Sequence, residues 1–107
     1  MTNKYWYEGE VIRVVDGDTV EVLIDLGFKT YRTLMCRLYG INTPERGHPG
    51  FKAATDHLIG LTQGKLLIHS NKDKTGKYGR YLLTLYTLND VNINEQMILD
   101  GHAVKYE

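Results

Sequence analysis

One cysteine, no net charge and no long apolar run are the first features of this sequence, and each excludes a class of protein. The single cysteine, Cys36, excludes an intrachain disulfide, and its place between apolar residues of a strand pattern predicts a buried thiol. The 13 basic and 13 acidic residues balance, so overall charge does not indicate a nucleic-acid partner, and any such binding must use a local patch. No apolar run approaches the ~20 residues of a membrane-spanning helix, so no membrane association is expected.

The first residues also lack the apolar core of a signal peptide. We therefore expect a cytoplasmic protein, or a secreted one if a leader has been removed. The length of 107 residues predicts one domain, residues 1–107, with a modest apolar core.

Alternation of apolar and polar residues predicts three strands in the first part of the chain. They cover residues 11–15, residues 20–26 and about residues 29–39. The first two are separated by Asp16-Gly17, which is a strong signal for a hairpin. Three consecutive strands followed by a helix indicate a small antiparallel sheet or barrel.

The second part of the chain is predicted to add two helices and two strands. Its expected elements are a helix through Phe51, Ala54, Leu58 and Leu61, a strand at 65–69, a polar loop at 71–80, a strand at 81–88, and a helix that begins at Asn92 with Glu95 as a capping pair and ends at Gly101. The order β-β-β-α-β-β-α fits a mainly β fold with helices, a five-stranded barrel of the oligonucleotide-binding (OB) type.

Several side chains have the chemistry that phosphodiester cleavage requires. Arginine can grip two phosphate oxygens at once, and Arg37 and Arg80 are the candidates for this role. A hard divalent cation prefers carboxylate, amide and carbonyl oxygens, which Asp18, Asn42 and the backbone of Thr43 can supply. A carboxylate beside the cation can take the proton of the attacking water or orient that water, and Glu45 is the candidate.

In residue type, order and approximate spacing, three motifs resemble the staphylococcal (thermo)nuclease family over nearly the whole chain. They are Asp16-Gly17-Asp18-Thr19, the stretch from Arg37-Leu38 to Thr43-Pro44-Glu45, and Lys77-Tyr78-Gly79-Arg80. The resemblance implies an OB-type barrel and a calcium-dependent nuclease that cuts single-stranded or frayed DNA and RNA with little sequence specificity and leaves a 3′-phosphate.

The resemblance also implies a role for each site residue. Asp18 and the Thr43 carbonyl would be metal ligands, Arg37 and Arg80 would grip the scissile phosphate, and Glu45 would act on the attacking water. Lys77 and Tyr78 would contact a terminal phosphate of the nucleotide.

Two departures from the family pattern affect these expectations. Asn42 stands where the family usually has an aspartate, which predicts weaker calcium binding or a preference for another divalent cation. The sequence given stops near Tyr106, without the further tyrosines and the third C-terminal helix of well-studied members. Tyr106 is a candidate substitute for those tyrosines, but we do not count it among the site residues. A monomer is expected, with a dimer as the alternative because the third helix is missing.

Simpler interpretations remain open for each motif. The Asp16-Gly17-Asp18 stretch can be a hairpin turn and nothing more, and Arg37 can pair with Glu21 across the sheet as a surface salt bridge. The lysines around position 75 can be a solvated face, and the four histidines show no metal-ligand spacing. The alternative to an enzyme is therefore a non-catalytic OB module that binds single-stranded nucleic acid or a protein.

Overall fold

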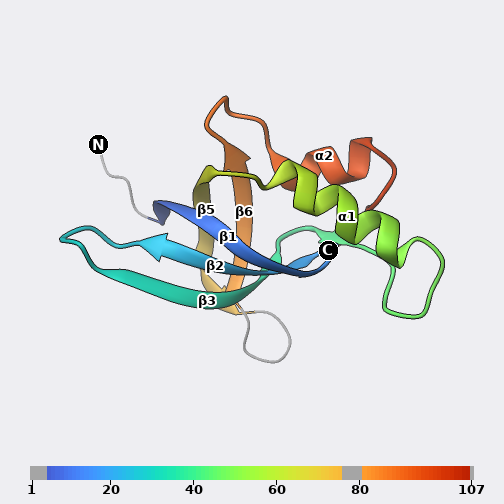
Figure 1. Ribbon diagram of the computed structural model, residues 1–107, viewed down its shortest axis with the longest axis horizontal. Helices are drawn as coiled ribbons and strands as arrows, with labels where there is room; N and C mark the ends of the chain where they lie inside the picture. The colour runs from blue at the N-terminus through green and yellow to red at the C-terminus, as the bar shows by residue number, and fades with distance from the viewer. Residues whose placement is uncertain (1–4, 76–80, 107) are drawn as a thin grey trace.

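A closed β-barrel is the centre of the computed structural model, which describes residues 5–75 and 81–106 (Figure 1). In chain order the elements are β1 (Trp6–Asp16), β2 (Thr19–Asp25), β3 (Tyr31–Leu38), β4 (Ile41–Asn42), α1 (Phe51–Leu61), β5 (Lys65–Thr75), β6 (Tyr81–Thr87), α2 (Ile93–Leu99) and β7 (Val104–Lys105). The barrel order is β1-β2-β3-β6-β5, closed by antiparallel pairing of β1 with β5. The five-stranded barrel with two helices confirms the predicted OB-type fold.

Strands β1, β2 and β3 form the predicted meander, and alternate residues of β2 and β3 face the barrel interior. Val20 and Val22 of β2 and Cys36 and Leu38 of β3 are completely buried. Burial raises the pKa of the Cys36 thiol to about 12, so the thiol stays protonated and packs as an apolar group. This confirms Cys36 as a core residue.

Helix α1 lies beside the barrel and packs against β1 and α2 (Figure 1). Ala54 and Leu58, at the helical spacing seen in the sequence, are completely buried, and Phe51 and Leu61 are half-buried. The predicted apolar stripe is therefore the face that α1 turns toward the core.

Helix α2 has the start and the end that its sequence predicts. The Asn92 side chain accepts a hydrogen bond from the Glu95 backbone N–H at 3.0 Å, which is an N-cap contact. Gly101 has φ +83° just after the helix, and the His102 N–H donates to the Met97 carbonyl at 2.9 Å. This left-handed glycine and the bond across it make a Schellman C-cap, which turns the chain sharply toward β4.

Asn94 connects α2 to the barrel through side-chain hydrogen bonds. Its amide nitrogen donates to the carbonyls of Tyr39, at 2.9 Å, and Leu83, at 3.0 Å, while its oxygen accepts from the Leu85 N–H at 3.2 Å. The side chain is buried, so satisfying it at three points fixes α2 relative to β6 and to the turn after β3. The segment that follows α2 is thereby held near the end of β3.

Strand boundaries differ from the prediction in the polar segment. A loop was expected over residues 71–80, but β5 continues to Thr75, which pairs with Tyr81 of β6. The ladder with β6 is irregular here, and backbone pairing at its two ends, of Ser70 with Leu83 and of Thr75 with Tyr81, brackets the polar sequence; ladder hydrogen bonds do not depend on apolar side chains. Residues 76–80 lie outside the described residues. The first strand begins at Trp6, five residues before its predicted start at residue 11.

Two short strands were not predicted at all. Ile41 pairs with Lys105 and Asn42 with Val104, and the Tyr106 N–H donates to the Gly40 carbonyl at 2.8 Å. Elements of two residues carry no periodicity, so only their pairing identifies them. This β4–β7 pair brings the end of the described chain to the segment that carries the candidate site.

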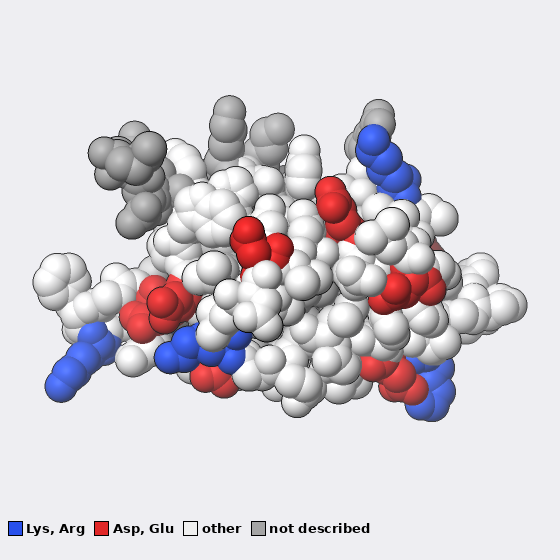
Figure 2. Space-filling view, turned by 90° about the horizontal axis from the view of Figure 1, so that it is seen from above, with Lys and Arg blue, Asp and Glu red and all other residues white. Residues whose placement is uncertain are grey.

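Charged residues of both signs are interspersed over the face of the molecule seen in Figure 2, as the balanced composition predicts. Within residues 5–75 and 81–106, no helix is both long and apolar enough to cross a membrane.

Candidate active site

The turn between β1 and β2 carries the first candidate residue to the end of β3. Asp16 pairs with Thr19 across the turn, and the Asp18 N–H donates to the Asp16 carboxylate at 3.1 Å. Gly17 lies so close to β4 and α1 that an added Cβ would be 2.8 Å from Thr43 Oγ1 and 2.9 Å from Ala54 Cβ. The motif is thus a hairpin turn, and a glycine is needed because the turn packs directly against the chain that follows β4.

Asp18 is the centre of the site. Its side chain is only 11% exposed, and its Oδ2 accepts from the Thr43 N–H at 3.0 Å and from Arg37 Nη2 at 3.3 Å. Its Oδ1 accepts from Thr19 Oγ1 at 3.2 Å, and its backbone carbonyl accepts from the Leu38 N–H at 2.8 Å. One buried carboxylate therefore links the turn, the end of β3 and the segment after β4.

Arg37 lies at the end of β3 and contacts two of the predicted site residues. Its Nη2 donates to Asn42 Oδ1 at 2.7 Å as well as to Asp18, and its side chain is 16% exposed. The alternative pairing of Arg37 with Glu21 is wrong. Glu21 pairs instead with Arg13 of β1 at 3.2 Å, because Arg13 is its neighbour in the ladder, whereas Arg37 lies opposite Thr19.

A cation–π contact adds Tyr106 to the site. The Arg37 guanidinium carbon lies 5.1 Å from the centre of the Tyr106 ring, at a position just after β7. This contact is worth about 0.5–2 kcal/mol, depending on how far water is excluded. Tyr106, which is not among the predicted site residues, thus lies directly beside Arg37.

The carboxylates of Asp16 and Asp18 lie close together at the turn between β1 and β2. Burial first, and the neighbouring Asp18 carboxylate second, raise the pKa of Asp16 above its usual value. The candidate metal ligands nearby are all oxygen atoms, from the side chains of Asp18 and Asn42 and the backbone of Thr43. A hard divalent cation prefers such oxygen ligands. Among the residues that the structure describes, no group of three or more histidine, cysteine or acidic side chains is arranged to hold a metal.

Four predicted site residues remain, of which the structure describes Glu45. Glu45 is exposed, two residues after Thr43, in a turn where its carbonyl accepts from the His48 N–H at 3.0 Å. Lys77, Tyr78 and Arg80 lie outside the described residues, so their roles stay predictions.

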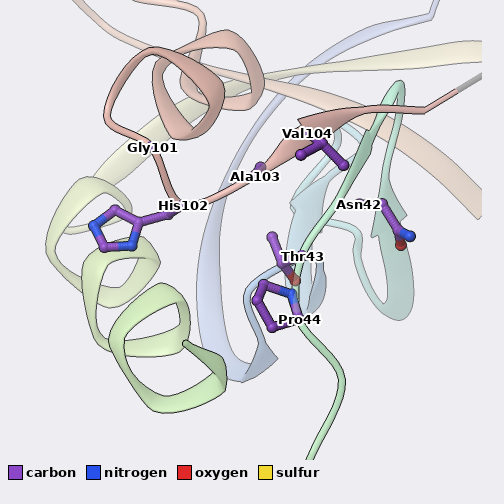
Figure 3. Close-up of a pocket in the computed structure, with 7 residues that line it drawn as sticks. All are labelled: Asn42, Thr43, Pro44, Gly101, His102, Ala103 and Val104. Atoms are coloured by element: carbon purple, nitrogen blue, oxygen red, sulfur yellow. The ribbon is translucent and has the colours of Figure 1, made fainter. Parts of the chain in front are cut away.

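Two cavities flank the Arg37–Asn42 hydrogen bond. The Tyr106 cavity, of about 470 Å³, is lined by residues 37–40 together with Leu82, Lys105 and Tyr106. The His102 cavity, of about 310 Å³, is lined by residues 42–44 and 101–104, and its walls are seen in Figure 3. Arg37 therefore lines one cavity and its partner Asn42 lines the other.

Comparison with known proteins identifies the family. The model of the family described as staphylococcal nuclease homologue matches residues 35–107, which include the end of β3 and both cavities. The chain belongs to the staphylococcal nuclease family. A protein of Escherichia coli named "Uncharacterized endonuclease" is 32% identical over 99 residues, which are 92% of this chain and 61% of that protein.

Two further relatives have similar coverage. The protein named "Micrococcal nuclease" of Shigella flexneri is 32% identical over 108 residues, 94% of this chain and 59% of the relative. "Protein ParB" of Escherichia coli is 32% identical over 111 residues, with the same two coverages of 94% and 59%. The chain thus spans about three-fifths of the length of the curated relatives it matches.

In this member of the staphylococcal nuclease family, the fold brings together four residues that the sequence nominated: Asp18, Arg37, Asn42 and Thr43. They come from three segments separated by up to 25 positions, and they meet where β2, β3 and β4 end or begin. Tyr106 and His102 were not among the predicted site residues. The anchoring of α2 by Asn94 and the pairing of β4 with β7 bring them to the site.

Proposed function

We propose that this chain hydrolyses phosphodiester bonds in single-stranded or frayed DNA and RNA, with a divalent cation and with little sequence preference. The observation that carries the proposal is the cluster at the end of β3, where Arg37 and a buried carboxylate share one hydrogen-bond network. Family membership and relatives named as nucleases support the same activity. A site that grips backbone phosphate and reads no base edge would cut without sequence preference.

Arg37 would hold the scissile phosphate. Both of its hydrogen bonds to Asn42 and Asp18 use Nη2, and a guanidinium has five N–H groups in a planar fork. Its other N–H groups can bind phosphate oxygens without breaking the contacts that orient it. Such a preset donor stabilises the negative charge that develops on the phosphate as water attacks.

Asp18, Asn42 and the Thr43 carbonyl would hold the cation, for which calcium is our first choice. When bound, the cation would stabilise charge on the phosphate and favour ionisation of a nearby water. Asn42 supplies a neutral oxygen that Arg37 already engages at 2.7 Å. We therefore propose a weaker calcium site than an aspartate would give, or a site for another divalent cation.

Glu45 would act on the attacking water from the turn after β4. In the proposed reaction the water oxygen forms a bond to phosphorus, the bond from phosphorus to the 5′-oxygen breaks, and that oxygen takes a proton from solvent, so the products are a 3′-phosphate and a 5′-hydroxyl. Glu45 accepts a proton from the water or orients it. Arg80 would be the second phosphate clamp, and Lys77 and Tyr78 would contact a further phosphate.

A non-catalytic binding module is the second candidate. It is favoured by Asn42, which engages Arg37 at 2.7 Å but adds no negative charge for a cation, so that Arg37 would bind phosphate without one. In that case the same surface would hold single-stranded nucleic acid and leave it intact.

The deciding experiment is cleavage of a single-stranded DNA that carries a fluorophore and a quencher. The purified protein is assayed with calcium, magnesium or manganese, and with a chelator, beside Glu45→Gln. Cation-dependent cleavage that Glu45→Gln lowers by about a hundredfold or more is expected. Binding without cleavage under every cation would establish the binding module instead.

A further inference from the structure

We infer that the His102 cavity binds one of the two nucleosides joined by the scissile phosphate, while the Tyr106 cavity faces the other. The inference rests on the proposed function, which places that phosphate at Arg37. It assigns a nucleoside as the ligand of a cavity formed by residues 42–44 and 101–104.

The two cavities lie on either side of the β4–β7 pair. Gly40 and Lys105 line the Tyr106 cavity, whereas Asn42 and Val104 line the His102 cavity. Arg37 lines the first cavity and bonds Asn42, which lines the second. A phosphodiester has a nucleoside on each side of its phosphate. A phosphate bound at Arg37 would therefore direct one nucleoside into each cavity.

The walls of the His102 cavity suit a nucleobase. Figure 3 shows the Pro44 ring on one side and His102, whose ring extends over α1, on the other, with Ala103 just before β7 and Val104 at its start. Val104 is 65% exposed although it is apolar. A base can cover this apolar surface with its flat face, and the imidazole can stack on the base or bond its edge. The volume of about 310 Å³ is within the range of small-ligand sites.

The His102 ring packs against a hydrogen-bonded neighbour, His57. Its ring lies 4.3 Å from the ring of His57 on α1, with the planes at 31°. His57 Nε2 lies 2.6 Å from Asp100 Oδ2, and Gln96 donates to the other oxygen of Asp100 at 2.9 Å. A side chain already ordered loses little conformational entropy when a ligand binds, which favours binding at His102.

The inference is tested first by binding, with chelator present so that no cleavage occurs. The imidazole signals of His102 and His69 are followed by NMR during titration with the dinucleotide TpT, thymidine 3′-phosphate and thymidine 5′-phosphate. His69 is the matched control, because it is also half-buried and stacked, on Trp6 at 4.6 Å, but lies on β5. TpT and one of the two monophosphates should shift the His102 signals, whereas the other monophosphate should leave them unchanged.

Kinetics supply the second readout. Val104→Ala and His102→Ala should each lower kcat/KM for TpT by roughly tenfold, the effect expected from losing one base contact. The same variants should leave unchanged the cleavage of a nitrophenyl ester of thymidine phosphate that lacks the nucleoside of this cavity. Val104→Ala keeps the test valid if His102→Ala fails to fold.

Two outcomes overturn the inference in different ways. If the parent protein cleaves TpT but the His102 signals do not move and both variants cleave TpT normally, only the cavity assignment fails. If the parent neither binds nor cleaves any of these compounds, the proposed function fails together with it.

Discussion

Arg37 Nη2 donates to Asn42 Oδ1 at 2.7 Å, a shorter distance than the 3.3 Å to the Asp18 carboxylate. A neutral amide thus makes the closer contact with the arginine that we expect to bind phosphate. The position where the staphylococcal nuclease family usually has an aspartate is therefore occupied by a residue that orients Arg37 but adds no negative charge for a cation.

The substitution Asn42→Asp should strengthen cation binding, because it adds a carboxylate beside Asp18. We expect calcium affinity to rise by about tenfold or more, since ligand charge tunes calcium sites over orders of magnitude. Isothermal titration calorimetry with calcium measures this directly, and cleavage should rise at limiting calcium. Unchanged calcium affinity in Asn42→Asp would show that position 42 is not a cation ligand.

The substitution Arg37→Lys should remove most activity while leaving the barrel intact. Lysine keeps the positive charge beside Asp18, but it loses the planar fork that can reach Asn42 and a phosphate together. We expect kcat/KM for single-stranded DNA to fall by roughly a hundredfold or more. Circular dichroism and thermal unfolding are the controls for the fold. Equal kcat/KM in Arg37→Lys and the parent would exclude bidentate phosphate binding by Arg37.

The substitution Gly17→Ala should damage stability and site together. The new Cβ would lie 2.8 Å from Thr43 Oγ1 and 2.9 Å from Ala54 Cβ, so the turn must move and carry Asp18 with it. We expect a loss of about 1–3 kcal/mol in the free energy of unfolding, measured by urea denaturation.

Gly60→Ala is the matched control for that substitution. Gly60 lies inside α1 with nothing within 4 Å of an added Cβ, so alanine there should stabilise the protein by about 0.5–1 kcal/mol. If both glycine variants changed the free energy of unfolding by the same amount and sign, close packing at Gly17 would not be the cause.

Stability should depend on pH through Asp16. Its folded-state pKa is raised above the usual 3.8 by burial and by Asp18, so ionisation disfavours the folded state. The penalty is absent below the unfolded pKa and is complete above the folded pKa. Asp16→Asn keeps the oxygen that accepts from the Asp18 N–H, and it should raise Tm at about pH 7 but not at about pH 3.

Thermal unfolding at the two pH values, with chelator present so that no cation contributes, measures this difference. A Tm for Asp16→Asn that is equal to or lower than that of the parent at about pH 7 would contradict the assignment.

The sequence by itself determined the two helices, the longer strands apart from their ends, and the local chemistry of the site. Period-two alternation predicted the meander, helical spacing predicted α1, and Asn92 and Gly101 predicted both ends of α2. These signals act between residues a few positions apart, where backbone sterics and turn chemistry decide the conformation. The chemistry of their side chains was sufficient to nominate Asp18 and Arg37 as site residues.

Only the tertiary structure decided which of these residues meet. It paired Arg37 with Asn42 and Asp18 rather than with Glu21, because the turn after β1 packs against the end of β3. It also continued β5 through a polar segment expected to be a loop.

The structure alone placed Tyr106 over Arg37 and His102 beside His57, through contacts that span 69 and 45 positions of the chain. Such contacts depend on barrel closure and on the pairing of β4 with β7, and neither leaves a periodic signal in the residues that make it.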